Sequence, residues 1–278
     1  MPTRRYLERD LASQLQEIAA RDGTRLAFRL TGSGPVRVAL VHSLAMDHSF
    51  WTPVAERLAT AATVLTWDCR GHGASGKPPG PYAAGQFADD LADLLAGIGW
   101  TSAVVAGASM GGCVSLAFAG GHADMVQGLG LFDTTAWYGA DAPAQWAERA
   151  DKAVKDGLGG LVDFQKTRWF GDAFRHARPD IVEASVAVFL NNDVRAYAET
   201  CRMLGTADLR DILPAIKVPT RIVVGEEDYA TPTAMADALH AGITGSVRTI
   251  YKGGRHLTPL EMPDRIANEL RGIIEATQ

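Results

Sequence analysis

The sequence contains few cysteines and no long apolar segment. Its three cysteines, Cys69, Cys113 and Cys201, lie far apart and form no C-x-x-C pair. This odd, scattered set excludes a disulfide framework and a cysteine-ligated zinc site, and it is typical of buried thiols in a reducing cytoplasm. No apolar run reaches the length of about 18 residues that a membrane-spanning helix needs. Residues 1–10 are charged and lack the apolar core of a secretory signal.

The chain also lacks a surplus of positive charge. Lys and Arg number 27 against 32 Asp and Glu, which gives a net charge of −5. A nucleic-acid partner is not expected, because no basic excess is available to neutralise phosphates. Apolar residues make up 47% of the chain and charged residues 21%. These values exclude disordered, collagenous and coiled-coil classes and indicate a soluble globular protein.

Short β-rich segments alternate with helical segments along the chain. This alternation predicts an α/β fold with a mostly parallel, eight-stranded sheet and helices on both faces. The first two strands flank Arg21-Asp22-Gly23-Thr24, a predicted hairpin turn. The expected strands are residues 15–19, 25–30, 36–42, 63–67, 102–106, 128–132, 220–224 and 247–251.

The length of 278 residues alone predicts about two domains. The chain pattern indicates another division, because residues 136 to about 213 show helical spacing without a convincing strand. We therefore expect one α/β core, formed by residues 1–136 and 213–278, into which a helical cap of residues 137–212 is inserted. Residues 1–13 precede the fold proper and are expected to form a short amphipathic helix or a disordered arm.

Gly107-Ala108-Ser109-Met110-Gly111 fits the pattern G-x-S-x-G. The pattern alone is weak, but here an apolar strand precedes it and a helix follows it. On such a turn a serine is strained so that its hydroxyl stands above the sheet, and the helix N-terminus favours developing negative charge. The alternative is a glycine-rich turn with an N-capping serine. The context favours a nucleophile at Ser109.

A serine hydroxyl needs a general base to attack at neutral pH. Among the seven histidines, His256 is preferred because it lies in a loop between a predicted strand and the last predicted helix. A histidine that is merely exposed in a loop is the alternative. The base itself needs a carboxylate that holds its tautomer and stabilises its positive charge.

Asp228, shortly after the strand at residues 220–224, is the preferred carboxylate. Glu226, Glu227 and Asp133 compete for this role, and either aspartate could instead cap a turn or a helix. Asp228 is preferred because the order serine, acid, histidine along the chain is that of α/β-hydrolases.

Two backbone N–H groups are expected to stabilise the oxyanion that forms during catalysis. One belongs to Met110, which follows the candidate nucleophile, and the other to Leu44, in the loop after the strand at residues 36–42. By contrast, Arg70-Gly71-His72-Gly73 lacks the glycine spacing of a phosphate loop. We expect it to be a structural turn in which Arg70 and His72 pair with neighbouring backbone.

From about residue 20 to residue 274 the sequence resembles α/β-hydrolases of the 3-oxoadipate enol-lactonase type. The resemblance rests on residues 42–44 with 47–51, residues 68–75, residues 107–112, Arg168-Trp169-Phe170 with Phe174 and Pro179, Tyr197, residues 207–210, and His256-Leu257 with Glu261 and Pro263. It implies a nucleophile at Ser109, an acid at Asp228 and a base at His256, in agreement with the choices made from the residues.

One position departs from this resemblance. Enol-lactonases of this type usually carry a basic residue where this chain has Trp137, and their substrate bears a free carboxylate. An indole supplies apolar area and one hydrogen-bond donor but no charge. The departure predicts a less charged ester or lactone as substrate, with Trp137 lining its binding site.

Together, these patterns predict a serine hydrolase that cleaves a carboxylic ester or lactone through an acyl-enzyme intermediate, without a cofactor or metal. Its expected partner is that small molecule, rather than nucleic acid or a membrane, and its expected location is the cytoplasm. Homo-oligomerisation is left open. The same triad also suits hydrolysis of a C–C bond or perhydrolysis, and a receptor-like protein with little turnover is the alternative from another class.

Overall fold

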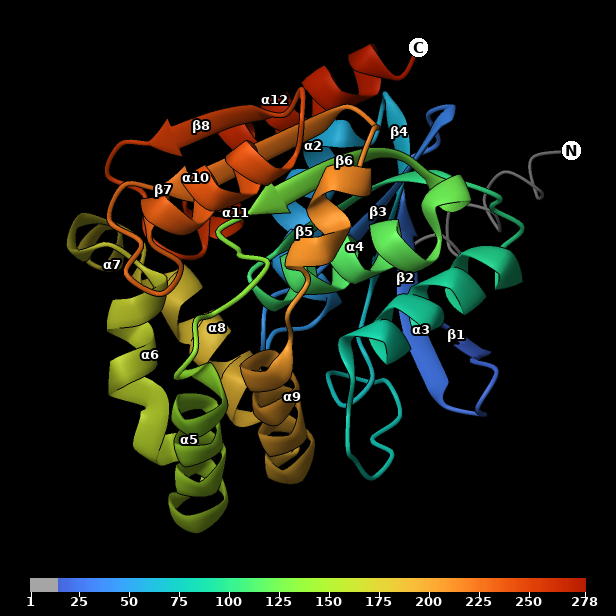
Figure 1. Ribbon diagram of the computed structural model, residues 1–278. Helices are drawn as coiled ribbons and strands as arrows, with labels where there is room; N and C mark the ends of the chain where they lie inside the picture. Colours follow the sequence, from blue (N-terminus) through green and yellow to red (C-terminus); the bar gives the residue numbers. More distant parts are fainter. Residues whose placement is uncertain (1–14) are drawn as a thin grey trace, which may run out of the picture.

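A computed structural model describes residues 15–278, so the prediction for residues 1–13 lies outside the described residues. One sheet has eight strands in the order β1-β2-β4-β3-β5-β6-β7-β8 (Figure 1). β1 and β2 pair antiparallel, as do β2 and β4, and the other neighbours are parallel. The predicted eight-stranded, mostly parallel sheet is therefore confirmed. The strands are β1 (Gln16–Ala19), β2 (Arg25–Thr31), β3 (Val36–Val41), β4 (Ala62–Trp67), β5 (Ala103–Ala108), β6 (Val126–Phe132), β7 (Thr220–Gly225) and β8 (Val247–Tyr251).

Helices cover both faces of this sheet. Central strands are apolar throughout because both of their faces are covered, and all six residues of β5 are buried. α3 (Ala84–Gly97), α4 (Met110–Gly121) and α10 (Thr233–Gly242) lie on one face, and α2 (Thr52–Leu58) packs with α12 (Pro263–Ala276) on the other (Figure 1). Shorter helical turns are η1 (His48–Trp51), η2 (Ala123–Met125), η4 (Arg210–Ala215) and α11 (Thr258–Glu261).

The segment between β6 and β7 is helical, as its sequence pattern predicts. It contains α5 (Ala142–Asp156), η3 (Leu158–Leu161), α6 (Val162–Trp169), α7 (Asp172–Ala177), α8 (Pro179–Leu190) and α9 (Val194–Thr206), which we call the cap helices. They gather on one side of the sheet, with α5 packed along α9 (Figure 1).

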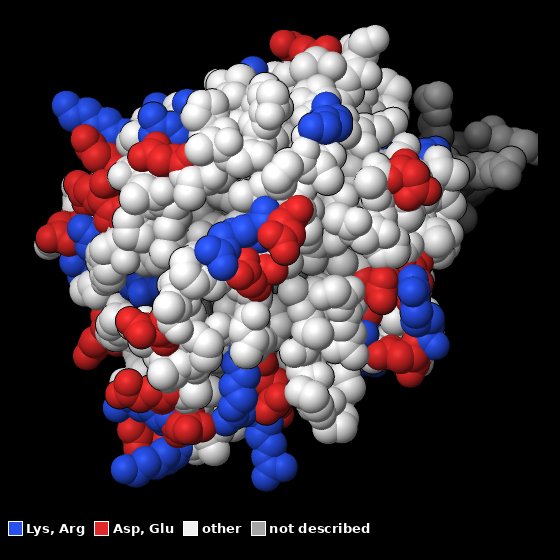
Figure 2. All heavy atoms as spheres, viewed as in Figure 1, with Lys and Arg blue, Asp and Glu red and all other residues white. Residues whose placement is uncertain are grey.

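Surface charge is mixed in sign on the side of the molecule shown in Figure 2. Basic and acidic side chains alternate along its lower edge, where the cap helices lie (Figure 2). Within residues 15–278, no helix is both long enough and apolar enough to cross a membrane.

The loop after β4 is anchored by a buried ion pair. Nε and Nη2 of Arg70 donate to the Asp90 carboxylate of α3 at 2.6 and 2.5 Å, and Nη1 lies 3.0 Å from Asp22 Oδ2. His72 Nδ1 lies 3.0 Å from the Arg70 carbonyl oxygen. The expected structural turn is thus confirmed, but Arg70 pairs with two carboxylates rather than with backbone. Carboxylates distant in sequence give no local pattern that predicts such a pair.

Asp90→Ala should destabilise the fold, because it leaves the buried Arg70 guanidinium with one remaining carboxylate partner. We expect a loss of about 3 kcal/mol in the free energy of unfolding by urea titration. Asp93→Ala, on the same helix, is the matched control: its partner Arg21 is 56% exposed, so the loss should stay below about 1 kcal/mol. Equal losses in the two variants would contradict the anchoring role of Arg70.

Candidate active site

Ser109 lies at the junction between β5 and α4. Its backbone has φ +54° and ψ −117°, a conformation that is strained for a residue with a Cβ atom. Two glycines permit the sharp turn: a Cβ on Gly107 would lie 2.0 Å from the Gly111 carbonyl oxygen, and one on Gly111 would lie 2.1 Å from that of Val41. The strand-to-helix turn predicted from G-x-S-x-G is confirmed, with Ser109 at the N-terminus of α4.

Ser109, His256 and Asp228 form one chain of hydrogen bonds. His256 Nε2 lies 2.9 Å from Ser109 Oγ, and His256 Nδ1 lies 2.8 Å from Asp228 Oδ2. All three side chains are buried. With its Nδ1 proton donated to the carboxylate, the imidazole has Nε2 free to accept the serine proton.

Asp228 is held by the loop that follows it. Its Oδ1 accepts the backbone N–H groups of Ala230 and Thr231 at 2.7 and 3.0 Å, and Thr231 Oγ1 donates to Oδ2 at 2.7 Å. These contacts fix the carboxylate and, through it, the imidazole ring. The competing carboxylates Glu226 and Glu227 are exposed and make no hydrogen bond to that ring within the described residues.

Asp133, the third competitor, joins two loops instead. Its Oδ1 accepts the Gly225 N–H at 3.1 Å, and its Oδ2 accepts the N–H and the hydroxyl of Thr258 at 3.0 and 2.6 Å. Burial and the neighbouring Asp228 carboxylate raise the pKa of Asp133 well above its ordinary value. Asp133 therefore connects the end of β7 to the turn that follows His256.

The loop after β3 carries the predicted oxyanion donor. His42 Nδ1 lies 2.8 Å from the Ser43 carbonyl oxygen, while His42 Nε2 accepts the Cys69 N–H at 3.0 Å. Burial lowers the pKa of His42, which favours the neutral ring. Because the Ser43 carbonyl and the Leu44 N–H share one trans peptide, they point in opposite directions. His42 thereby fixes the direction of the Leu44 N–H. Within residues 15–278, neither this N–H nor that of Met110 donates a hydrogen bond.

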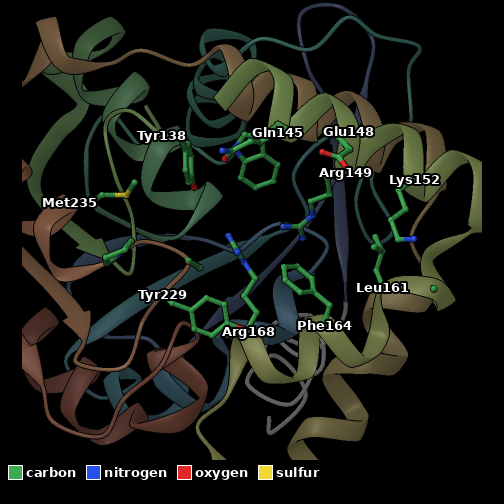
Figure 3. A pocket seen from close by; sticks show the side chains of 14 residues that line it. Tyr138, Gln145, Glu148, Arg149, Lys152, Leu161, Phe164, Arg168, Tyr229 and Met235 are labelled. Carbon is green, nitrogen blue, oxygen red and sulfur yellow. The ribbon is translucent and has the colours of Figure 1, made fainter. Parts of the chain in front are cut away.

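A cavity of about 640 Å³ opens between the cap helices and the segment formed by the loop after β7 and the start of α10 (Figure 3). It is lined by Tyr138, Gln145, Trp146, Glu148, Arg149, Lys152, Gly160, Leu161, Phe164, Arg168, Tyr229, Ala230, Pro232 and Met235. A smaller cavity beside it is lined by Ser43, Leu44, Ser109, Trp146, Arg149, Arg168, Trp169 and His256. The two cavities share Trp146, Arg149 and Arg168, so the large one adjoins the hydrogen-bonded triad.

Arg149 and Arg168 both point into the large cavity (Figure 3). Arg149 Nε donates to the Tyr197 hydroxyl at 2.7 Å, and its guanidinium lies 5.0 Å from the centre of the Trp146 ring. Burial and the neighbouring Arg149 lower the pKa of Arg168 to about 10. Neither arginine forms an ion pair with an Asp or Glu of the described chain. Two charged guanidiniums without a carboxylate partner therefore face the space next to Ser109.

Comparison with known proteins assigns this fold to a family. The model of the alpha/beta hydrolase family matches residues 38–269. The chain belongs to the alpha/beta hydrolase family. A 3-oxoadipate enol-lactonase of Acinetobacter baylyi is 26% identical over 271 residues, which cover 94% of this chain and 97% of that protein.

Solved structures of other family members agree with this assignment. An enol-lactonase from Burkholderia xenovorans LB400 has a TM-score of 0.89 and 31% identity, and the match covers 94% of this chain and 100% of that one. A thermophilic esterase from Thermogutta terrifontis, solved with malate bound, has a TM-score of 0.89 and 29% identity over 95% of this chain and 99% of its own. The similar proteins named here are thus two enol-lactonases and an esterase.

Trp137 lies beside the large cavity rather than among the residues that line it. It lines a neighbouring cavity of about 410 Å³, which shares Tyr138 and Met235 with the large one. There the Arg210 guanidinium lies 3.9 Å from the centre of the Trp137 ring. An isolated antiparallel bridge pairs Trp137 with Asp208. The next residue, Tyr138, lines both cavities. That Trp137 lines the substrate site stays a prediction, and the large cavity is lined by the next residue, Tyr138.

The positive charge that the cap supplies was not predicted from the sequence. Arg149 falls on the buried face of α5, whose other members include Ala142, Trp146 and Ala153. An arginine on the apolar side of an amphipathic helix is a signal that the sequence offered. Arg168 was considered only as one of the residues that carry the resemblance to enol-lactonases. The expectation of a less anionic substrate rested on the uncharged side chain of Trp137 alone and did not take the charges of Arg149 and Arg168 into account.

Near His256, the Glu261 carboxylate lies half-buried between core and cap. Its Oε1 accepts the Gly171 N–H at 2.9 Å, and its Oε2 accepts the Arg255 N–H at 2.7 Å. Burial raises the pKa of Glu261 from 4.5 to about 7, although both hydrogen bonds and the Arg255 charge oppose the shift. Within residues 15–278, no group of three or more His, Cys, Asp or Glu side chains is arranged to hold a metal ion.

The raised pKa of Glu261 gives a testable pH dependence of stability. The folded protein holds this proton up to pH about 7 and the unfolded chain only to about 4.5. This stabilising contribution is therefore full below pH 4.5 and is lost as the pH rises to 7. Relative to Glu261→Gln, the wild type should lose about 1–3 kcal/mol of unfolding free energy over this interval. A difference that is flat with pH, measured by urea titration at each pH, would contradict the shifted pKa.

Proposed function

We propose that this α/β-hydrolase is a serine hydrolase that cleaves a carboxylic ester or lactone. Ser109 attacks the acyl carbon, His256 takes its proton, and Asp228 orients the imidazole and stabilises its positive charge. The observation that carries the proposal is the pair of hydrogen bonds, 2.9 Å from Ser109 to His256 and 2.8 Å from His256 to Asp228. A base within hydrogen-bond reach is what a serine needs to attack.

The reaction then follows two steps of acyl transfer. In the first, the N–H groups of Leu44 and Met110 stabilise the tetrahedral oxyanion, and His256 returns its proton to the leaving oxygen. In the second, His256 activates a water molecule that releases the acyl group from Ser109. With a lactone, the leaving oxygen stays attached to the acyl group until this hydrolysis.

We further propose that the substrate carries a carboxylate, contrary to the expectation drawn from Trp137. Arg149 and Arg168 meet in the cavity next to Ser109 and lack an acidic partner in the described chain. Bringing a carboxylate between them would relieve their mutual repulsion and add charge-assisted hydrogen bonds. The similar enol-lactonases and the similar esterase with malate bound are consistent with an anionic ligand.

The triad assignment predicts large and selective losses of activity. Ser109→Ala should lower kcat by at least about 10³-fold and Asp228→Asn by about 10⁴-fold, with the fold retained. Asp133→Asn is the matched control, because Asp133 holds the loops and not the imidazole. It should lower the free energy of unfolding by about 1–3 kcal/mol and keep most of kcat.

Steady-state kinetics on an activated ester and thermal melts decide between the outcomes. Turnover by Ser109→Ala equal to that of the wild type would contradict the serine mechanism. A loss in Asp133→Asn as large as that in Asp228→Asn would assign the acid to Asp133. A wild type that binds the ester but does not hydrolyse it would favour the receptor-like alternative.

The substrate-charge proposal predicts a preference that depends on Arg168. Aryl half-esters of a short dicarboxylic acid should be hydrolysed with a higher kcat/KM than neutral aryl esters of equal length. Arg168→Met should lower kcat/KM for the half-ester by about 10- to 100-fold and leave that for the neutral ester nearly unchanged. Arg210→Met, which removes the arginine beside Trp137, is the control and should change neither value. A neutral ester preferred by the wild type would contradict the anionic substrate class.

A further inference from the structure

The cap segment 167–171 lies along the loop that carries His256. The Thr167 carbonyl oxygen accepts Arg255 Nη1 at 2.8 Å. The Trp169 carbonyl oxygen accepts the backbone N–H groups of His256 and Leu257 at 3.2 and 3.1 Å. The Gly171 N–H completes the series by donating to Glu261. Backbone groups of alternate cap residues are thus bound by one short stretch of the core.

Glu261 is the one side chain of this set that binds both partners through its carboxylate. Its Oε1 holds the cap at the Gly171 N–H, and its Oε2 holds the histidine loop at the Arg255 N–H. Hydrogen bonds from N–H groups to a carboxylate are about twice as strong as those between neutral groups. Glu261 also ends α11, directly before α12 (Pro263–Ala276) packs on the sheet, so its backbone is fixed by the core.

Side chains of this cap segment enter the active site. Arg168 and Trp169 line the small cavity together with Ser109 and His256. Arg168 has no ion-pair partner of its own in the described chain, so its position depends on the backbone of residues 167–171. The contacts that hold this backbone therefore set the distance between the imidazole and the guanidinium.

From this arrangement we infer that Glu261 is a positioning residue that fixes Arg168 relative to His256. The inference rests on the proposed function, since it takes Arg168 to bind the anionic group of the substrate. Glu261 itself touches no reacting atom. Its carboxylate binds the Gly171 N–H and the Arg255 N–H and so fixes the distance between Arg168 and His256. The enzyme can then bind the carboxylate of a substrate while the scissile carbonyl of the same substrate lies at the catalytic residues.

Other charged groups near this carboxylate do not bridge the two segments in the same way. Glu227 Oε2 accepts Arg255 Nη2 at 3.1 Å, and Asp172 Oδ1 lies 3.8 Å from Arg255 Nη1. Both bind only the Arg255 side chain within this cluster. Their presence keeps the Arg255 guanidinium near Thr167, whereas the two backbone N–H groups depend on Glu261.

Glu261→Gln tests this role. The amide of the glutamine has only one oxygen, so only one of the N–H groups of Gly171 and Arg255 keeps its acceptor. Glu226→Gln is the matched control: Glu226 accepts the Gly253 N–H of the same loop at 3.2 Å and makes no cap contact. Hydrogen–deuterium exchange should become about tenfold faster in the peptide that contains Gly171 for Glu261→Gln. It should be unchanged for Glu226→Gln.

The kinetic readout is the ratio of kcat/KM for the half-ester to kcat/KM for its neutral counterpart. Loss of turnover through His256 lowers both values and cancels in this ratio, whereas displacement of Arg168 lowers only the first. Glu261→Gln should reduce the ratio about tenfold, mainly through KM for the half-ester. A global loss of stability, the outcome of a merely structural role, would leave the ratio of the folded enzyme unchanged.

A second variant removes the hydrogen bond between the Gly171 N–H and Glu261 by a substitution in the cap. Gly171 has φ −63° and Phe170 before it has φ −129° and ψ 139°, values that suit a proline at position 171. Gly171→Pro removes the N–H. Gly171→Ala keeps it, and its Cβ would meet nothing closer than 3.5 Å. We expect Gly171→Pro to reproduce the Glu261→Gln effect on the ratio and Gly171→Ala to have little effect.

The two substitutions together complete the test. In a double-mutant cycle, Glu261→Gln should have little further effect in the Gly171→Pro background, because both remove the same contact. Additive effects, or a Glu261→Gln variant that matches Glu226→Gln in both exchange and ratio, would overturn the inference. If the wild type shows no preference for the half-ester, the anionic substrate class fails, and the exchange measurement alone decides whether Glu261 holds the cap.

Discussion

The hydrogen bond between His256 Nε2 and Ser109 Oγ joins residues that are 147 positions apart in the chain. Its 2.9 Å length requires the strained turn after β5 and the loop after β8 to be placed independently and correctly. Parallel strands bring their carboxyl ends to one edge of a sheet, which is why loops after β3, β5, β7 and β8 meet there. The cap helices, inserted after β6, close over the same edge (Figure 1).

Charge in this site is divided between core and cap. The core supplies the carboxylate of Asp228 and the imidazole of His256, whereas the cap supplies Arg149 and Arg168. The cap cations face a cavity of about 640 Å³, in which a substrate would exclude water and thereby strengthen each electrostatic contact. In the function that we propose, core residues carry out the reaction and cap residues select the substrate.

Much of the fold was predictable because it is periodic. Buried parallel strands such as β5 are continuous apolar runs, and the G-x-S-x-G turn follows one directly. Ser109 and His256 could be chosen from their places next to strands, and the hydrogen-bonded arrangement agrees with that choice. Asp228 was separable from Asp133 only by its order in the chain, because both carboxylates follow strands.

Features that depend on distant partners were not predictable in the same way. Local sequence does not show that Arg70 meets Asp90, because nothing in either segment marks the other as its partner. Trp137 was predicted to line the substrate site, whereas the next residue, Tyr138, lines the large cavity, because neighbouring side chains in extended backbone point to opposite sides. The bridge from Trp137 to Asp208 decides which side each takes, and that bridge forms only in the folded chain.

Labelling with a fluorophosphonate, followed by peptide mass analysis, tests the central claim most directly. We expect a single adduct on Ser109. It should be lost in His256→Ala, and its formation should be slowed by a short dicarboxylate that occupies the space between Arg149 and Arg168. An adduct on another residue, or labelling of Ser109 that does not depend on His256, would contradict the proposed triad. Labelling that a dicarboxylate does not slow would contradict the anionic site.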